Sequence, residues 1–147
     1  NQEVMEHIER IRGMAAQKIG FVEDYMEART KATSAPKVSI VSAPQDYVNM
    51  DGKTVSADAM DLCVRAISVG MLHKAYPMTV AVASGAAAKI PGTIVSALVR
   101  PVEGDIIRLG HSSGVTEVDM KMDGETVLKG GVTRTARRIM DGYVYIR

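Results

Sequence analysis

Residues 78–88 read Met-Thr-Val-Ala-Val-Ala-Ser-Gly-Ala-Ala-Ala, and this uncharged stretch decides the fold. Pro77 stands where a first helical residue is favoured, and Lys89 followed by Pro91-Gly92 closes the segment. A helix that is small and apolar on all sides has to be buried on all sides. The stretch is too short to cross a bilayer, so its surroundings must be protein. We therefore expect this helix inside a curved sheet or a barrel.

The chain after Gly92 combines β-branched residues with turn signals, and it predicts a sheet around that helix. In the run from Thr116 to Met122 apolar and charged side chains alternate, which is typical of a half-buried strand. Asp123-Gly124 follows this run and is a strong signal for a hairpin turn. The expected strands are Thr93–Val99, Asp105–Leu109, Val115–Met122, Thr126–Lys129 and Tyr143–Arg147.

Further helical and strand patterns precede the uncharged stretch. Apolar residues at spacings of three and four predict an amphipathic outer helix over residues 3–19. Ser56 is a good N-cap for a second outer helix that runs to about Lys74. Residues 23–36 are polar and predict a loop, and residues 37–41 predict a short strand. Together these patterns predict an α+β fold, with a curved antiparallel or mixed sheet wrapped around a buried central helix.

The composition is that of one folded domain. At this length about two-thirds of the unfolded surface can be buried. A net charge of +1, from 18 basic and 17 acidic residues, argues against a general nucleic-acid binder. A single cysteine excludes an internal disulfide framework, and three scattered histidines provide no metal-binding motif. No stretch is long and apolar enough to span a membrane, so we expect a cytoplasmic chain without a metal. Asn1 has no initiator Met before it, which predicts a piece of something longer.

Residues Gly110–Gly114 read Gly-His-Ser-Ser-Gly and formally match the Gly-x-Ser-x-Gly motif of serine hydrolases. That motif needs a helix after the serine and a histidine later in the chain. Here an alternating strand pattern follows, and no histidine stands after His111. We therefore reject a hydrolase with Ser112 as its nucleophile. Two interpretations remain, namely a loop whose amides and hydroxyls hold a carboxylate, and a plain tight turn.

The start of the uncharged helix is a second candidate site. The amides of Met78, Thr79 and Val80 precede the first helical hydrogen bond, so they could bind an anion at the positive end of the helix dipole. The alternative is that Thr79 only caps the helix or packs locally.

Charged and nucleophilic residues elsewhere favour structural roles. Three arginines in residues 134–138 form a basic cluster, which suits a bidentate carboxylate contact or, by default, a solvated surface. Arg65 and His73 would share one face of the second helix as structural hydrogen-bonding groups. Cys63, in the middle of that helix, is expected to be a small buried hydrophobe and not a reactive thiolate.

Several motifs, taken in order, resemble the PrpF-like isomerases over nearly the whole chain. They are Pro36-Lys37-Val38, Ala43–Val48, Arg65–Gly70 with His73–Ala75, Ile90–Thr93, Gly110–Gly114 and Arg134–Gly142. The resemblance implies a fold similar to diaminopimelate epimerase, which has two lobes, each a curved sheet around a central helix. It also implies cofactor-independent proton transfer on unsaturated di- and tricarboxylates, such as 2-methylaconitate, methylitaconate or oxalomesaconate.

The resemblance also assigns a role to individual residues. The substrate-binding residues that it implies are Met78, Thr79, Val80, His111, Ser112, Ser113 and Gly114. The family loop usually carries Pro where Ser112 stands, and a Gly commonly lies beside the threonine, where Met78 or Val80 stands here. The Lys or Cys groups that act as acid and base belong to a lobe without a counterpart in this chain. No catalytic residue is therefore expected here.

The match corresponds to only the C-terminal, smaller part of such an enzyme. We therefore interpret residues 1–147 as its substrate-binding C-terminal lobe. Its expected partners are a small carboxylate substrate and the missing N-terminal lobe, with which the strand Tyr143–Arg147 would pair. The alternative is a free-standing module that binds carboxylates or oligomerises without catalysis, and a homo-oligomer stays open in both cases.

Overall fold

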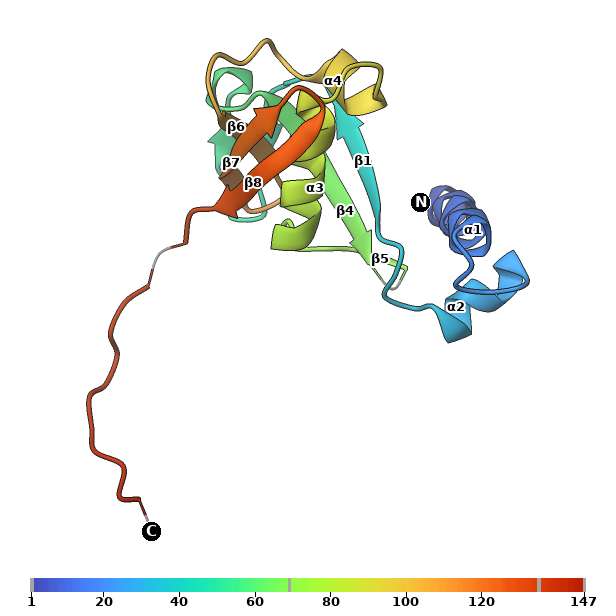
Figure 1. The fold of residues 1–147 in the computed structure, drawn as a ribbon, viewed down its shortest axis with the longest axis horizontal. Helices are drawn as coiled ribbons and strands as arrows, with labels where there is room; N and C mark the ends of the chain where they lie inside the picture. Colours follow the sequence, from blue (N-terminus) through green and yellow to red (C-terminus); the bar gives the residue numbers. More distant parts are fainter. Residues whose placement is uncertain (1, 69, 135, 147) are drawn as a thin grey trace.

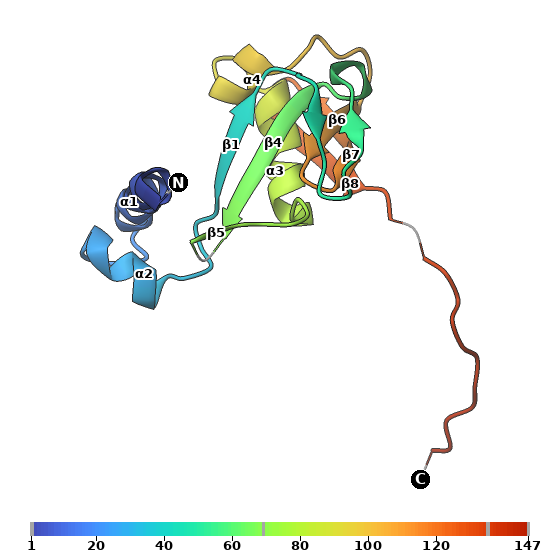
Figure 2. The same cartoon turned by 180° about the vertical axis from the view of Figure 1, so that it is seen from behind.

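The computed structural model describes residues 2–68, 70–134 and 136–146, which form a helical unit, a half-barrel and a C-terminal tail (Figure 1). The helical unit contains α1 (Gln2–Lys18), the 3-10 helix η1 (Tyr25–Glu27) and α2 (Ala28–Lys31). The half-barrel contains β1 (Val38–Ser42), β2 (Tyr47–Val48), β3 (Thr54–Val55), the 3-10 helix η2 (Ala57–Ala59), β4 (Leu62–Ser68), β5 (Met71–Leu72), α3 (Met78–Lys89), α4 (Ile94–Leu98), β6 (Ile106–His111), β7 (Gly114–Asp123) and β8 (Thr126–Val132). The view from behind in Figure 2 shows the helical unit to one side of the sheet, on the side of β1.

The main sheet is mixed and curls strongly around α3. Its strand order is β1-β4-β6-β7-β8, and β5 pairs with the end of β4. β4 and β6 run parallel, with Leu62 opposite Leu109, and the other neighbours in this sheet are antiparallel. A separate hairpin of β2 and β3 carries residues 49–53 at its tip. The predicted α+β fold with a curved sheet around a central helix is thus confirmed as a half-barrel.

Alternate side chains of the central strands point toward α3 and form one core, because successive side chains of a strand face opposite ways. Its buried members are Leu62, Val64, Ala66, Tyr76, Ala81, Ile107, Leu109, Val118 and Met120. Glycines let the helix approach the sheet closely. A Cβ on Gly85 would lie 2.8 Å from Met120 Cγ, and one on Gly130 would lie 2.6 Å from Val82 Cγ1.

Helix α3 is confirmed, but it is not enclosed on all sides as its sequence predicts. Ala81 and Ser84 are buried, and the Ser84 hydroxyl hydrogen-bonds Tyr76 Oη at 2.7 Å. In contrast, Met78 and Ala83 are exposed. The sheet covers only one side of the helix, because it is open between its edge strands β1 and β8. An apolar helix with an open side favours a further covering element beyond these residues.

The helix predicted from Ser56 to Lys74 is wrong. Ser56 does act as an N-cap, since its hydroxyl accepts the Asp58 amide at 3.3 Å, but it caps only η2. The segment then continues as β4 and β5. Leu62, Val64 and Ala66 stand at every second position and are all buried, so the true period of this segment is two.

Two of the predicted strands differ as well. Residues 93–99 contain the short helix α4, whose N-cap Thr93 accepts the Ser96 amide at 2.9 Å through its hydroxyl oxygen. Residues 136–146 form a tail without helix or strand, in which Tyr143 is 98% exposed, and Arg147 of the predicted last strand lies outside the described residues.

Residues 23–36, predicted as a loop, contain η1 and α2. The first helix and the remaining predicted strands are confirmed with small shifts of their ends.

Candidate functional site

The first turn of α3 offers backbone amides without a helical partner. Pro77 precedes the helix in an extended conformation and, within the described residues, no side chain caps it. The first helical hydrogen bond runs from the Ala81 amide to the Pro77 carbonyl at 2.8 Å. The amides of Met78, Thr79 and Val80 therefore lie ahead of the helical ladder, at the positive end of the helix dipole. Met78 and Thr79 are exposed, so this end of the helix is open to a ligand.

The predicted loop of residues 110–114 is a tight turn between β6 and β7. Ser112 and Ser113 form the turn, and Gly114 follows with φ +134°, a conformation that favours glycine. The Tyr47 hydroxyl lies 2.7 Å from the His111 carbonyl oxygen and 2.8 Å from that of Gly114, so it bridges both ends of the turn. The turn is therefore held in place from the β2–β3 hairpin.

The two serines connect this turn to its neighbours. Ser113 Oγ donates a hydrogen bond to the Lys74 carbonyl oxygen at 2.6 Å. The Ser112 carbonyl oxygen accepts one from the Met50 amide at 2.8 Å. Lys74 lies four residues before the first residue of α3, so the turn and the start of the helix are joined through a short segment.

His111 has a structural role inside the half-barrel. Its ring is buried and stacks on Tyr76, with 6.3 Å between ring centroids and 17° between planes. The Ser113 amide donates to Nδ1 at 3.2 Å, so the proton of the neutral ring lies on Nε2, 2.8 Å from Thr116 Oγ1. Burial, and then the charge of Arg65, lowers the pKa of His111 below its ordinary value of 6.5. The neutral imidazole thus holds the turn through these contacts.

The lowered pKa of His111 predicts a loss of stability in mild acid. Unfolded His111 takes up a proton near pH 6.5, whereas the folded ring does so only at lower pH, so the free energy of unfolding falls as the pH drops through 6.5 and levels off below the folded pKa. Urea denaturation at pH 7.5, 6.5 and 5.5 measures this slope. The slope should be smaller in His111→Gln and unchanged in the exposed control His7→Gln. An equal slope in His111→Gln and in the wild type would contradict the assignment of this pH dependence to His111.

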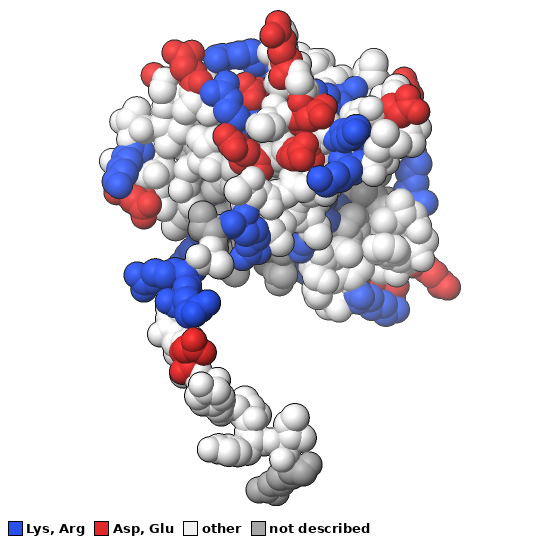
Figure 3. Space-filling model, turned by 60° about the vertical axis from the view of Figure 1, so that its left-hand side comes forward, with Lys and Arg blue, Asp and Glu red and all other residues white. Residues whose placement is uncertain are grey.

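One arginine of the predicted basic cluster lies at the start of α3. Arg134 Nη1 donates to Met78 Sδ at 3.0 Å, which brings a positive charge to the uncapped helix end. Arg137 is exposed, and Arg138 pairs with Asp141 at 3.4 Å within the tail. Figure 3 shows Lys and Arg side chains gathered where the tail leaves the half-barrel. The cluster therefore divides into one arginine near the candidate site and two on the tail.

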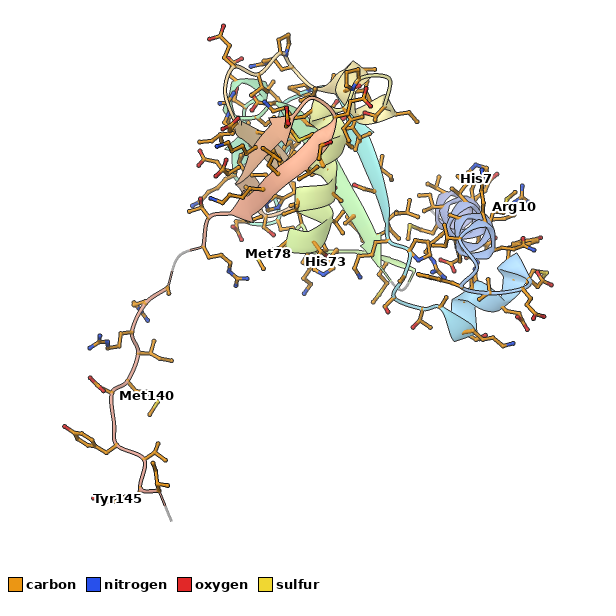
Figure 4. All side chains as sticks on the ribbon, in the orientation of Figure 1. His7, Arg10, His73, Met78, Met140 and Tyr145 are labelled. Atoms are coloured by element: carbon orange, nitrogen blue, oxygen red, sulfur yellow. The ribbon has the colours of Figure 1, made fainter. Side chains whose placement is uncertain are left out.

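A pocket of about 510 Å³ opens on the other side of the turn. Its lining residues are Val48, Asn49, Met50, Arg65, Leu72, His73, Lys74 and Ser112. The prediction that Arg65 and His73 share a helix face is wrong, because Arg65 lies on β4 and His73 follows β5, yet both line this pocket. Figure 4 shows His73 near Met78, below the start of α3. The pocket, the turn and the helix start thus lie at one end of the half-barrel.

Other kinds of site find no support in the described part of the chain. There, no three His, Cys, Asp or Glu side chains come together as a metal site requires. Cys63 is buried in β4, which confirms its expected burial although the element is a strand. Among the described helices, none is both long and apolar enough to cross a membrane.

Comparison with known proteins supports the resemblance seen in the sequence. The sequence model of the family described as PrpF protein matches residues 1–147. The chain belongs to the PrpF family. This PrpF chain is 39% identical to a 3-methylitaconate isomerase of Eubacterium barkeri over 99% of its own length, and 40% identical to a 2-methyl-aconitate isomerase of Shewanella oneidensis over 94%. A crystal structure of methylitaconate-delta-isomerase matches 98% of the chain with a TM-score of 0.90 and 39% identity.

The PrpF chain spans little more than a third of the proteins that it matches. It covers 39% of the Eubacterium barkeri protein, 36% of the Shewanella oneidensis protein and 38% of the crystallised isomerase chain. The similarity is therefore a partial one, which agrees with a need for other parts or partners.

Proposed function

We propose that this chain is the substrate-binding C-terminal lobe of a PrpF-type isomerase with a two-lobed fold like that of diaminopimelate epimerase. The proposed reaction moves a proton and a double bond in an unsaturated di- or tricarboxylate of the methylaconitate or methylitaconate type. The observation that carries the proposal is the uncapped start of α3, which lies beside the Ser112–Ser113 turn and Arg134. The similarity to isomerases along the whole chain supports it.

The chemistry of such a reaction suits this arrangement. Removal of an allylic proton leaves negative charge that spreads onto a neighbouring carboxylate. Backbone amides at the start of a helix stabilise that charge without moving, because they are already aimed at the anion. The free amides of residues 78–80 and the charge of Arg134 would supply this stabilisation. The acid and base would come from the other lobe, and no cofactor is proposed.

Two features of this chain support the need for a second lobe. The open side of α3 exposes Met78 and Ala83. The tail of residues 136–146 exposes large apolar side chains, among them Tyr145 at 93% and Ile146 at 97%. Exposed apolar surface of this extent is typical of a contact with another protein surface. We propose that residues 143–147 pair with the missing lobe as a strand.

The test is a ¹H–¹⁵N NMR titration of the chain with methylitaconate in ordinary water, with a parallel sample in deuterated buffer that reports any deuterium entering the ligand. Shifts of the Thr79, Val80 and Gly114 amides, without deuterium in the ligand, are expected of a binding lobe that lacks its acid and base. Met78→Pro removes one amide of the first turn at a position where proline fits a helix, so it should weaken binding. Met78→Ala, which loses the same side chain, is the matched control.

Two outcomes would contradict the proposal. Shifts that are equal in Met78→Pro and Met78→Ala would exclude the helix amides as the binding group. Exchange of the allylic protons by this chain alone would show that it carries its own base.

A further inference from the structure

The pocket beside the turn holds positive charge that no carboxylate of the described residues compensates. Its lining contains Arg65, His73 and Lys74, and it contains neither Asp nor Glu. Two other arginines that are at least partly buried are paired with carboxylates: Arg108 with Asp61 at 2.6 Å, and Arg12 with Glu9 at 2.6 Å. A half-buried arginine without a counter-ion is a candidate anion site.

Arg65 is held rigidly by its neighbours. Its Nη1 donates to the carbonyl oxygens of Val64 at 2.7 Å and Gly110 at 3.2 Å, and its guanidinium lies 4.5 Å from the centre of the Tyr47 ring. Among the described residues, Nε and Nη2 make no hydrogen bond. A fixed guanidinium with one free edge suits a carboxylate. Its conformational entropy is already lost in the folded chain, so binding does not have to remove it.

Lys74 extends the positive surface around Arg65, and His73 lies beside it. The His73 Nδ1 lies against the Ala75 carbonyl oxygen and donates to it, which leaves Nε2 available. The Lys74 ammonium makes no ion pair or hydrogen bond within the described ranges, whereas the Lys74 carbonyl oxygen accepts the Ser113 hydroxyl. Both residues are exposed and belong to the segment that leads from β5 into α3.

The pocket and the start of α3 are separate but adjacent. Ser112 lines the pocket, while Ser113 of the same turn is bonded to the segment that leads into the helix. Two anion-binding groups thus flank one turn. A ligand with a single carboxylate can use only one of them.

We propose that Arg65, with Lys74, binds a second carboxylate of the substrate, one that does not carry the charge developed in the reaction. The inference rests on the proposed function and adds to it the residues that recognise the second carboxylate. Arg65 then fixes the orientation of the substrate, and the helix start receives the carboxylate next to the reacting carbon.

The test compares succinate with butyrate, which has the same carbon chain but a methyl group in place of one carboxylate. Titrations followed by ¹H–¹⁵N NMR should show that the chain binds succinate more tightly. Arg65→Gln should weaken succinate binding about tenfold, as expected for the loss of a charge-assisted hydrogen bond. It should leave butyrate binding unchanged, and so should the exposed control Arg10→Gln for both ligands. Lys74→Gln, whose side chain makes no contact that folding needs, should weaken succinate binding in the same direction.

The outcomes separate the two proposals. If succinate and butyrate bind equally and neither Arg65→Gln nor Lys74→Gln has an effect, the second carboxylate site is wrong, although the helix site stands. If neither ligand shifts the amides of Thr79 and Gly114, the proposed function itself fails. If Arg65→Gln loses the dispersed spectrum of a folded chain, the Lys74→Gln result decides, and an unchanged affinity for succinate there overturns the inference.

Discussion

Replacement of Asp61 by alanine is expected to lower the free energy of unfolding of the half-barrel by about 2–4 kcal/mol. Asp61 is only 5% exposed, and its carboxylate receives three hydrogen bonds from Arg108: from the amide at 2.8 Å, from Nε at 3.2 Å and from Nη2 at 2.6 Å. Removal of the carboxylate leaves the amide, Nε and Nη2 of Arg108 without their hydrogen-bond acceptor. The side chain of Arg108 is 36% exposed, and water there keeps the loss below that of a fully buried pair.

Asp61 also joins β4 and β6, the parallel pair inside the sheet. Its amide donates to the Arg108 carbonyl oxygen at 2.7 Å, and its own carbonyl oxygen accepts the Arg100 amide at 2.8 Å. The residue stands directly before β4, and Arg108 lies in β6, so the contact fixes the register of the β4–β6 pair. These backbone bonds remain in Asp61→Ala, and the expected loss comes from the carboxylate, whose bonds to Arg108 join the same two strands.

Chemical denaturation followed by circular dichroism measures this effect. The matched control is Asp58→Ala, which removes a carboxylate that is 92% exposed and 3.5 Å from Arg100, with an expected loss below about 0.5 kcal/mol. Asp61→Asn keeps the shape of the side chain but removes its charge. Its loss of unfolding free energy should lie between those of Asp61→Ala and Asp58→Ala. Equal midpoints for Asp61→Ala and Asp58→Ala would show that the buried network does not stabilise the fold.

The same contact predicts how the half-barrel responds to strong acid. Burial alone would raise the pKa of Asp61, but hydrogen bonds from the Arg108 side chain and amide outweigh it and lower the pKa below its ordinary value of 3.8. A lowered folded pKa means that the stabilisation is complete above the unfolded value and is lost as the pH falls through the folded value. The wild type should therefore lose this stability below about pH 4, and Asp61→Asn should not.

The central helix could be predicted because its signal is local. An uncharged stretch that begins after Pro77 and ends before Pro91 permits few structures other than a buried helix. The curved sheet around it followed from the same argument, since only a wrapped surface can cover a small helix on several sides. Its open side could not be predicted, because it depends on where the sheet ends at its edge strands β1 and β8, which no local pattern shows.

The segment 56–74 shows where periodicity fails. Met60, Val64, Ile67 and Met71 stand at helical spacings, yet every second residue from Leu62 to Ala66 is also apolar, and members of both sets are buried, because β4 is covered on both faces. Apolar runs this short fit both periods. The sheet selects the strand, because β1, β6 and β5 all pair with β4, and such long-range pairing leaves no trace in a local pattern.

Only the local features of the candidate site could be predicted, because long-range contacts leave no trace in a local pattern. The helix start and the turn Ser112–Ser113 are local features and were found from the sequence. The pocket around Arg65 is built from β4, the β2–β3 hairpin and the segment after β5, which only the tertiary fold brings together. The one signal available was the charge of Arg65 inside an otherwise apolar stretch, Cys63 to Ile67.

Replacement of Arg12 by alanine is expected to unfold the helical unit while the half-barrel stays folded. Arg12 is 3% exposed and joins α1 to α2. It binds Glu9 through Nη2 at 2.6 Å and Nε at 2.9 Å, and it donates to the carbonyl oxygens of Ala28 at 3.0 Å and Ala32 at 2.6 Å. Breaking a buried ion pair costs about 3–5 kcal/mol, because the remaining partner and the carbonyls lose their hydrogen bonds without gaining water.

The helical unit has little else to compensate for that loss. Its own core consists of Ala16, Val22 and Ala28 with Ala32 beside them, and it shares no buried residue with the core around α3. A small core of this kind contributes far less than the large aliphatic side chains of the half-barrel. Local unfolding of α1 and α2 therefore costs less free energy than global unfolding. The contacts of Arg12 decide whether the helical unit stays folded.

Amide hydrogen exchange resolves the two parts of the molecule. In Arg12→Ala the amides of α1 and α2 should exchange freely, while those of β4, β6 and β7 keep the protection of the wild type. Arg10→Ala removes an exposed arginine from the same helix and should change neither set by more than about 0.5 kcal/mol. Protected α1 amides in Arg12→Ala would show that Arg12 does not hold the unit together. Loss of protection in both parts at once would show that the helices and the half-barrel fold as one cooperative unit.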